Sequence, residues 1–138
     1  MQVRKIRPGE AAPAIKIARK LGLDYPGMGS DPLWIAEEAG EIVGLVALKT
    51  HADCRELCAL GVLPRSRGKG IAGALVEALL AEAPGDVHLA TVIPGFFEGR
   101  GFRTVKEGIP ATFPAKRRTA WCEGCPRERC TVMLRTKQ

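Results

Sequence analysis

The fold is decided by the stretch Glu56-Leu57-Cys58-Ala59-Leu60-Gly61-Val62-Leu63-Pro64-Arg65-Ser66-Arg67-Gly68-Lys69-Gly70-Ile71-Ala72. An apolar run leads into a basic turn that contains glycines, and the turn opens directly into a helical pattern. The first N–H groups of a helix have no partner within it, and the helix dipole makes them a binding site for anions. Gly68 and Gly70 leave room for a ligand beside the backbone. The stretch therefore predicts a site for a phosphorylated cofactor, with added positive charge from Arg65, Arg67 and Lys69.

The glycine spacing narrows the choice of cofactor. The turn has neither the G-x-x-x-x-G-K-[ST] of a P-loop nor the G-x-G-x-x-G of a dinucleotide fold. It has Arg65-x-x-Gly68-x-Gly70. This pattern resembles the [RQ]-x-x-G-x-[GA] pyrophosphate loop of the GCN5-related N-acetyltransferases (GNATs), which binds acetyl-CoA. Taken alone, the hexapeptide is also compatible with a tight turn before an ordinary helix.

Two flanking segments strengthen the resemblance. Glu56–Val62 followed by Pro64 is similar to the fourth strand of the family, E-[IL]-x-x-L-x-V-x-P. Downstream, Phe96-Phe97-Glu98-Gly99-Arg100-Gly101-Phe102 is similar to the later family segment F-[FY]-E-x-x-G-F. With the preceding Thr91 and Pro94, it is similar to small N-acetylglutamate-synthase-like members. The resemblance covers roughly residues 30 to 107, and it implies an N-acetyltransferase that uses acetyl-CoA by direct transfer.

The hydrophobic patterns predict an α/β protein. Alternation and turn residues indicate strands, and 3.6-residue spacing indicates helices. The resemblance implies a GNAT fold, a mixed and mostly antiparallel sheet of six to seven strands with helices on both faces. We expect one domain over residues 1–138, with a Cys-rich loop at about 119–130. The predicted strands are Val3–Arg7, Leu33–Glu38, Ile42–Thr50, Cys54–Leu63, Val87–Val92, Phe102–Lys106 and Cys130–Thr136; the predicted helices are Ala11–Leu21, Gly70–Glu82 and Gly95–Gly99.

The resemblance also implies which residues hold the cofactor. In the family, pantetheine fills a gap between the fourth and fifth strands and pairs with exposed main chain, here around Leu60 and Val62. A main-chain N–H there would stabilise the developing oxyanion, although plain core packing also explains both side chains. The expected cofactor-binding residues are Leu60, Gly61, Val62, Arg65, Arg67, Gly68, Lys69, Gly70, Ile71, Ala72 and Phe97.

Glu56 is the candidate catalytic base. The family often has a glutamate here that deprotonates the incoming amine, and the alternative is a solvated glutamate or an ion-pair partner. Phe97 departs from the family pattern, because many members have a tyrosine at this position as the general acid for the leaving thiolate. The only tyrosine, Tyr25, is expected in a distant loop. We therefore expect either no dedicated acid or one supplied by water.

Three of the five cysteines, Cys122, Cys125 and Cys130, lie within nine residues near the C-terminus. The C-x₂-C spacing suits a metal such as zinc, with Cys54, Cys58, His51 or His88 as further ligands. Reduced thiols and an oxidisable pair are the alternatives. Otherwise we expect His51 and His88 to be packing or surface residues.

The acceptor is the least constrained part of the prediction. The loop between the last two strands helps to form the acceptor pocket of the family, and here it contains Lys116, Arg117 and Arg118. These side chains can pair with carboxylates, which with the synthase-like resemblance favours the α-amine of a small acidic amino acid. A solvated basic surface is the alternative.

Composition excludes several classes. The chain is 46% hydrophobic and 26% charged, and no apolar run approaches the roughly 20 residues of a membrane span. We expect a cytoplasmic protein with acetyl-CoA and a small amine acceptor as partners, and a homodimer is left open. The net charge of +6 also suits nucleic acid, but aromatics are only 5% and no nucleic-acid motif occurs. A non-catalytic acyl-CoA-binding regulator and a basic thiol or metal module that binds nucleic acid stay as alternatives.

Overall fold

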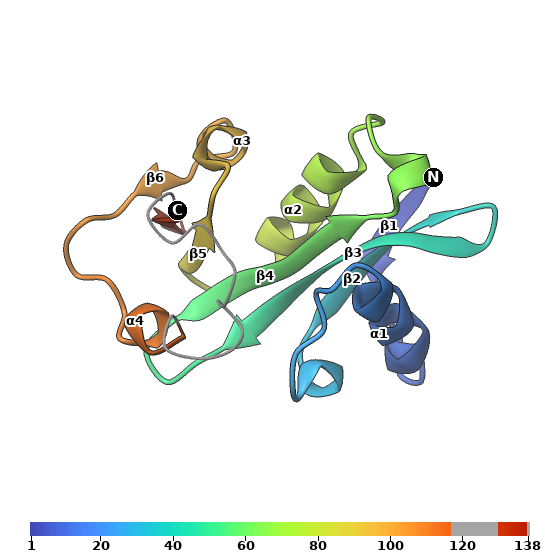
Figure 1. Ribbon diagram of the computed structural model, residues 1–138, viewed down its shortest axis with the longest axis horizontal. Coiled ribbons are helices and arrows are strands. Elements are labelled where there is room, and N and C mark those ends of the chain that lie inside the picture. Colours follow the sequence, from blue (N-terminus) through green and yellow to red (C-terminus); the bar gives the residue numbers. More distant parts are fainter. Residues whose placement is uncertain (117–129, 138) are drawn as a thin grey trace. The chain divides into compact units, whose positions relative to one another are not determined.

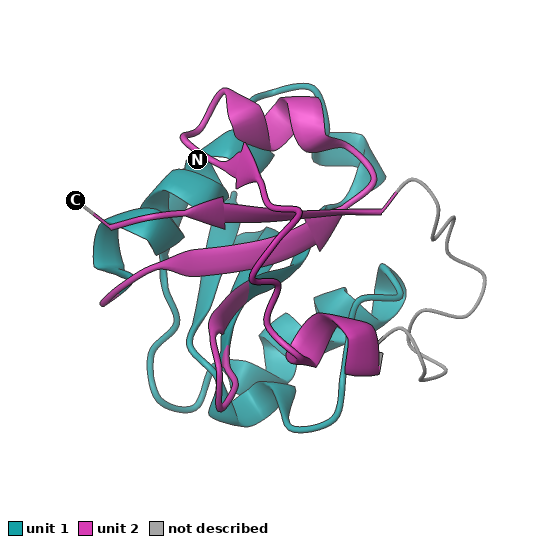
Figure 2. Cartoon of the chain, turned by 90° about the vertical axis from the view of Figure 1, so that its left-hand side faces the viewer, with its two compact units in different colours: residues 1–49, 57–83 teal, residues 50–56, 84–138 magenta. Residues whose placement is uncertain are grey.

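The computed structural model describes residues 1–116 and 130–137, which form two compact units (Figures 1 and 2). The first comprises residues 1–49 and 57–83, and the second comprises residues 50–56 and 84–138. The hydrogen-bonded order of the seven strands is β1-β2-β3-β4-β5-β7-β6, and β4 contributes residues to both units. The strands are β1 Gln2–Lys5, β2 Leu33–Glu38, β3 Glu41–Thr50, β4 Arg55–Val62, β5 Val87–Thr91, β6 Arg103–Thr104 and β7 Thr131–Arg135.

The first unit is built on two antiparallel pairings. β1 pairs with β2, and β2 pairs with β3 through a tight hairpin in which Glu38 faces Glu41. Ala39 and Gly40 both have positive φ, as two-residue hairpin turns require. The helical elements of this unit are α1 Ala11–Lys20, the 3₁₀ turns η1 Met28–Ser30 and η2 Pro64–Ser66, and α2 Ile71–Glu82.

Helices α1 and α2 cover opposite faces of this part of the sheet (Figure 1). α1 buries Ala14 and Ala18 in a cluster that includes Leu45 of β3. On the same strand, a Cβ added to Gly44 would lie 3.2 Å from Leu75 Cδ1 of α2. Because successive strand residues point to opposite faces, one helix packs on each side.

In the second unit, β5 pairs in parallel with the start of β4 and antiparallel with β7, and β7 also pairs with β6. Two short helices, α3 Pro94–Glu98 and α4 Thr112–Lys116, complete it. Its buried residues include Val87, Leu89, Phe97, Phe102, Phe113, Val132 and Met133.

The predicted GNAT fold and the order of its elements are confirmed, and most boundaries agree to within two residues. β6 is shorter than predicted, and α4 was not predicted. The single domain over 1–138 stays a prediction, and most of the Cys-rich loop lies outside the described residues. None of the described helices has the length and apolar character needed to cross a membrane.

Candidate active site

The turn between β4 and α2 closes on itself through its main chain. Ser66 N donates to Leu63 O at 2.9 Å, and Arg67 N donates to Pro64 O at 3.3 Å. Ser66 is buried, whereas Gly68 and Gly70 are exposed. Both glycines have a φ of 81°, the left-handed region that other residues avoid, and a Cβ on either would meet nothing within 4 Å. The turn therefore needs glycine for its conformation, and it leaves open space beside the backbone.

The main-chain N–H groups at the end of the turn and the start of α2 have no acceptor among the described residues. Within the described part of the chain, no hydrogen bond has the N–H of any residue from 68 to 73 as its donor. These groups belong to the end of the turn and the first turn of α2, where Gly70 is the N-cap and no acidic side chain occurs. The arrangement fits a phosphate group, because the unbonded N–H groups and the helix dipole both favour an anion.

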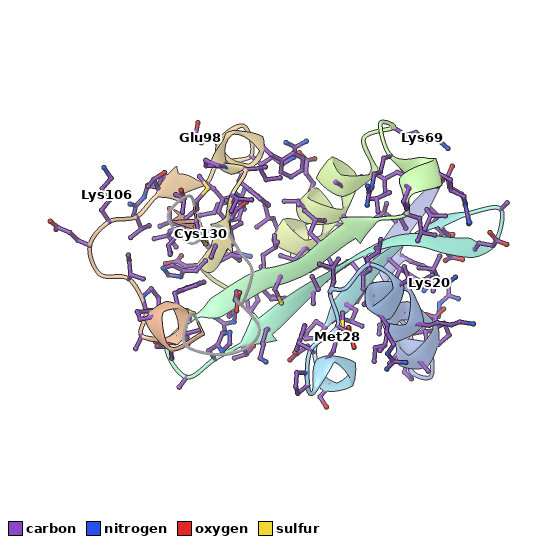
Figure 3. The ribbon with its side chains drawn as sticks, in the orientation of Figure 1. Lys20, Met28, Lys69, Glu98, Lys106 and Cys130 are labelled. Atoms are coloured by element: carbon purple, nitrogen blue, oxygen red, sulfur yellow. The ribbon has the colours of Figure 1, made fainter. Side chains whose placement is uncertain are left out.

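The basic side chains of the turn are engaged elsewhere. Arg65 Nη2 bonds Glu41 Oε2 at 2.7 Å, and Lys69 Nζ lies 3.1 Å from Glu38 Oε2. Figure 3 labels Lys69 on this turn. The Ser66 hydroxyl and then Lys69 hold the pKa of Glu38 below its usual range. Arg67 Nε donates to Val62 O at 2.9 Å. The side-chain charge is thus partly compensated, and the main-chain groups are the available donors.

β4 is irregular next to the turn. Ala59 has a φ of 55°, so the alternation of side chains breaks in mid-strand, and both Cys58 and Ala59 pack on the α1 side. Gly61 also faces α1, where an added Cβ would collide with Leu23. Leu60 is half-buried and Val62 is buried. We expected a gap between β4 and β5 that holds the pantetheine arm. Because these strands contribute to both units, the gap stays a prediction.

Glu56 belongs to the second unit. It is 2% exposed, and its Oε1 lies 2.8 Å from Nε2 of His51 in the short β3–β4 loop. That loop is closed by a bond from His51 N to Cys54 O at 2.8 Å. No motif in the sequence indicates the pair, although a short turn between two predicted strands places His51 and Glu56 near each other along the chain. We expected His51 to be a packing or surface residue, and the structure adds a hydrogen bond between its ring and the buried carboxylate of Glu56.

His88 and Phe97 also belong to the second unit. His88 faces Glu56 across the β4–β5 pair and contacts the ring of Phe113, and burial lowers the pKa of its imidazole. Phe97 is buried edge-on between the rings of Phe96 and Phe102, at centroid distances of 4.9 and 5.6 Å. Its contact with a cofactor stays a prediction.

Tyr25 lies in a loop, as predicted, and its distance from Phe97 stays a prediction because the two residues belong to different units. The Tyr25 hydroxyl donates to Asp31 Oδ2 at 2.7 Å, and it also interacts with the thiol of Cys58 in β4. The loop after α1 folds back over the sheet, because Met28 at its centre is buried in the α1 cluster. Breaker residues in the sequence revealed the loop but not its direction.

Most residues of the predicted acceptor and metal sites lie outside the described part of the chain. These are Arg117, Arg118, Cys122 and Cys125; the backbone of Lys116 ends α4, and Cys130 is half-buried just before β7. Among the described residues, no group of three His, Cys, Asp or Glu side chains could hold a metal. Zinc binding therefore stays a prediction, as does the carboxylate-binding role of the basic run.

A mixed sheet and a row of N–H groups that are unbonded among the described residues, at a glycine-capped helix, are the features expected of a protein that binds a phosphorylated cofactor. The acetyltransferase (GNAT) domain family matches residues 29–104, which is more than half of the chain. The chain belongs to this family and is an acyl-CoA-dependent N-acetyltransferase. No curated protein matches the chain by sequence.

Solved structures share the fold. One is Rv2747 from Mycobacterium tuberculosis in complex with CoA and NLQ, at 23% identity and a TM-score of 0.71 with both chains covered over 100%. Another is N-acetylglutamate synthase from Neisseria gonorrhoeae, complexed with coenzyme A and N-acetyl-glutamate. It is 21% identical with a TM-score of 0.73, and the match covers all of this chain but 36% of the synthase. A GNAT acetyltransferase from Staphylococcus aureus Mu50 is 16% identical over 99% of both chains, with a TM-score of 0.67. At these sequence identities the comparison shows a shared fold and nothing further.

Proposed function

We propose that this N-acetyltransferase transfers the acetyl group of acetyl-CoA to the α-amine of a small acidic amino acid in the cytoplasm. The observation that carries the cofactor half of the proposal is the row of unbonded N–H groups from residue 68 to residue 73. Assembly as a homodimer stays a prediction.

The turn and the start of α2 would hold the diphosphate of CoA. Gly68, Gly70 and the main chain of Ile71 and Ala72 supply N–H donors, since the side chain of Ile71 is itself buried in the core. When the diphosphate binds, Lys69 and Arg65 would either stay paired with Glu38 and Glu41 or pair with the diphosphate instead. The main chain of Leu60, Gly61 and Val62 would pair with the amides of the pantetheine arm.

Glu56 would act as the base. Attack joins the amine nitrogen to the thioester carbon and breaks the carbon–sulfur bond, while one nitrogen proton passes to the Glu56 carboxylate, directly or through water. The bond to His51 would orient the carboxylate. The released thiolate needs little help, because a thiol has a reference pKa of about 8.5. Phe97 cannot donate a proton, so water would return one to the sulfur.

Two features support an acidic acceptor. The basic run Lys116, Arg117 and Arg118 can pair with carboxylates. In addition, the synthase that shares the fold was solved with N-acetyl-glutamate. Arginine clusters bind carboxylates through paired, charge-assisted hydrogen bonds, which lysine-rich or neutral acceptors would not need.

The test is an acceptor panel with acetyl-CoA, in which free thiol is measured for glutamate, aspartate, glutamine, lysine peptides and polyamines. We expect glutamate or aspartate to be the best acceptor, and turnover confined to peptides or polyamines would contradict the proposal. With the best acceptor, Glu56→Gln should lower kcat/KM by roughly 10²–10⁴-fold. Exposed Glu98→Gln is the matched control and should leave the rate unchanged. Wild-type activity in Glu56→Gln would remove Glu56 from the mechanism.

A further inference from the structure

The first unit contains a polar cluster that the cofactor site does not use. It comprises Tyr25, Asp31, Lys49 and Cys58, all half-buried. The loop after α1 supplies Tyr25 and Asp31, β3 supplies Lys49, and β4 supplies Cys58, two residues beyond Glu56 in the chain. Tyr25 bonds Asp31 and interacts with Cys58, so these three members have partners within the cluster, and Lys49 is the member that could bind a ligand.

Lys49 is the unusual member. Its Nζ lies over the ring of Tyr25, 4.5 Å from the centroid. Among the ion pairs and hydrogen bonds of the described residues, none includes the Lys49 ammonium. A half-buried cation that faces a ring but no carboxylate keeps unused donors, and an anionic ligand would satisfy them better than water.

The cluster is held rigidly enough to select a ligand. Tyr25 is fixed by its bond to Asp31, and burial raises the pKa of its hydroxyl, which stays protonated as a donor. Met28 N donates to Tyr25 O at 3.2 Å, and Asp31 N donates to Met28 O at 3.1 Å. Figure 3 labels Met28, which is 2% exposed and anchors the loop. The ring under Lys49 is thus placed by the core rather than by solvent-exposed loop residues.

We propose that Lys49 binds a carboxylate of the amine acceptor, with its ammonium positioned by the ring of Tyr25. This assignment rests on the proposed function and names a carboxylate-binding residue within the first unit. Asp31 already accepts a hydrogen bond from Tyr25. Its negative charge would repel a carboxylate of the acceptor that lay beside Asp31 instead of beside Lys49. The cluster therefore fits an amino acid better than a simple inorganic anion.

The test compares Lys49→Met with Lys5→Met in the full chain at saturating acetyl-CoA. Lys5 is the matched control, because its Nζ also lies over a ring, 5.7 Å from that of Trp34, outside the cluster. The acceptors are the carboxylate-bearing amine with the highest kcat/KM and the methyl ester of all its carboxyl groups, which keeps the amine and removes every negative charge. We expect Lys49→Met to raise KM for the acid roughly 10- to 100-fold, the loss typical of a charged hydrogen bond. KM for acetyl-CoA and for the ester should stay near the wild-type values, as should all constants of Lys5→Met.

Lys49→Arg keeps the charge and should retain most of the preference for the acid over its ester. An equal loss for acid and ester in Lys49→Met would mean a structural role and would overturn the inference. A wild-type KM in that variant would overturn it too, and the proposed function would survive. If the wild-type protein acetylates only amines without a carboxylate, the proposed function fails and the inference falls with it.

Discussion

Gly68 has a φ of 81°, in open space at the mouth of the candidate cofactor site. Any other residue in this conformation is strained by about 1–2 kcal/mol. We predict that Gly68→Ala lowers the free energy of unfolding by about that amount and also weakens CoA binding, because the new methyl group occupies space that the diphosphate needs. Chemical unfolding and titration calorimetry with CoA measure the two effects.

Gly9 provides the control, since it has a φ of 88° in equally open space before α1. Gly9→Ala should lose similar stability and keep the wild-type affinity for CoA. If both variants bind CoA like the wild type, close approach at Gly68 is not part of the site. Equal weakening in both would mean that strain alone lowers the affinity.

Some residues of the site were predictable from the sequence, and others were not. The glycines of the turn were read directly from their spacing, because the conformation that they allow is a local property. The contacts of His51 with Glu56 and of Tyr25 with Asp31 depend on how loops return to the sheet. Neither loop direction is encoded in a short motif, so both contacts required the structure.

At the scale of elements, Arg4 ties the start of the chain together. From β1 it bonds both oxygens of Glu10, the N-cap residue of α1, at 2.7 Å, and Glu37 of β2 at 2.8 Å. The bonds from Arg4 and from the N–H of Arg7 lower the pKa of Glu10 to about 2. A carboxyl group with a lowered pKa stabilises the fold above its unfolded pKa, about 4.3, and loses that contribution as the pH falls through the folded value.

We therefore predict a pH-dependent difference between the wild-type protein and Glu10→Gln. The difference in unfolding free energy should be largest above about pH 5 and should shrink as the pH falls from about 4.5 to 2. Urea unfolding of both proteins over this range measures it. A difference that is constant or that grows on acidification would show that the ionised carboxylate does not join β1, β2 and α1.

Elements with strong local patterns were predictable, and elements held by distant partners were not. The hairpin at Glu38 and Glu41 follows from two largely apolar runs on either side of an Ala-Gly turn. In contrast, α4 was missed because its first residue is capped from far away. Thr112 donates from its hydroxyl and its N–H to Asp53, at 2.7 and 3.2 Å, across 59 residues. These bonds lower the pKa of Asp53, but nothing near Thr112 in the sequence announces them.

At the scale of the whole molecule, the net charge of +6 does not by itself make the cofactor site. Arg65 and Lys69, two of the basic residues in the turn, are paired with Glu41 and Glu38. In our proposal the attraction for an anion comes from oriented main-chain dipoles, which composition cannot reveal. The family and the fold were predictable from ordered motifs along the chain, whereas no motif specifies the acceptor.

The most direct test of the account is a pair of amide NMR titrations of the isotope-labelled protein, with CoA and with pantetheine. Pantetheine lacks the diphosphate and serves as the matched probe. We predict that CoA shifts the N–H resonances of residues 68–72 strongly and that pantetheine leaves them nearly unmoved. If CoA binds, as calorimetry would detect, and those resonances stay in place, the diphosphate is held elsewhere and the central claim is wrong.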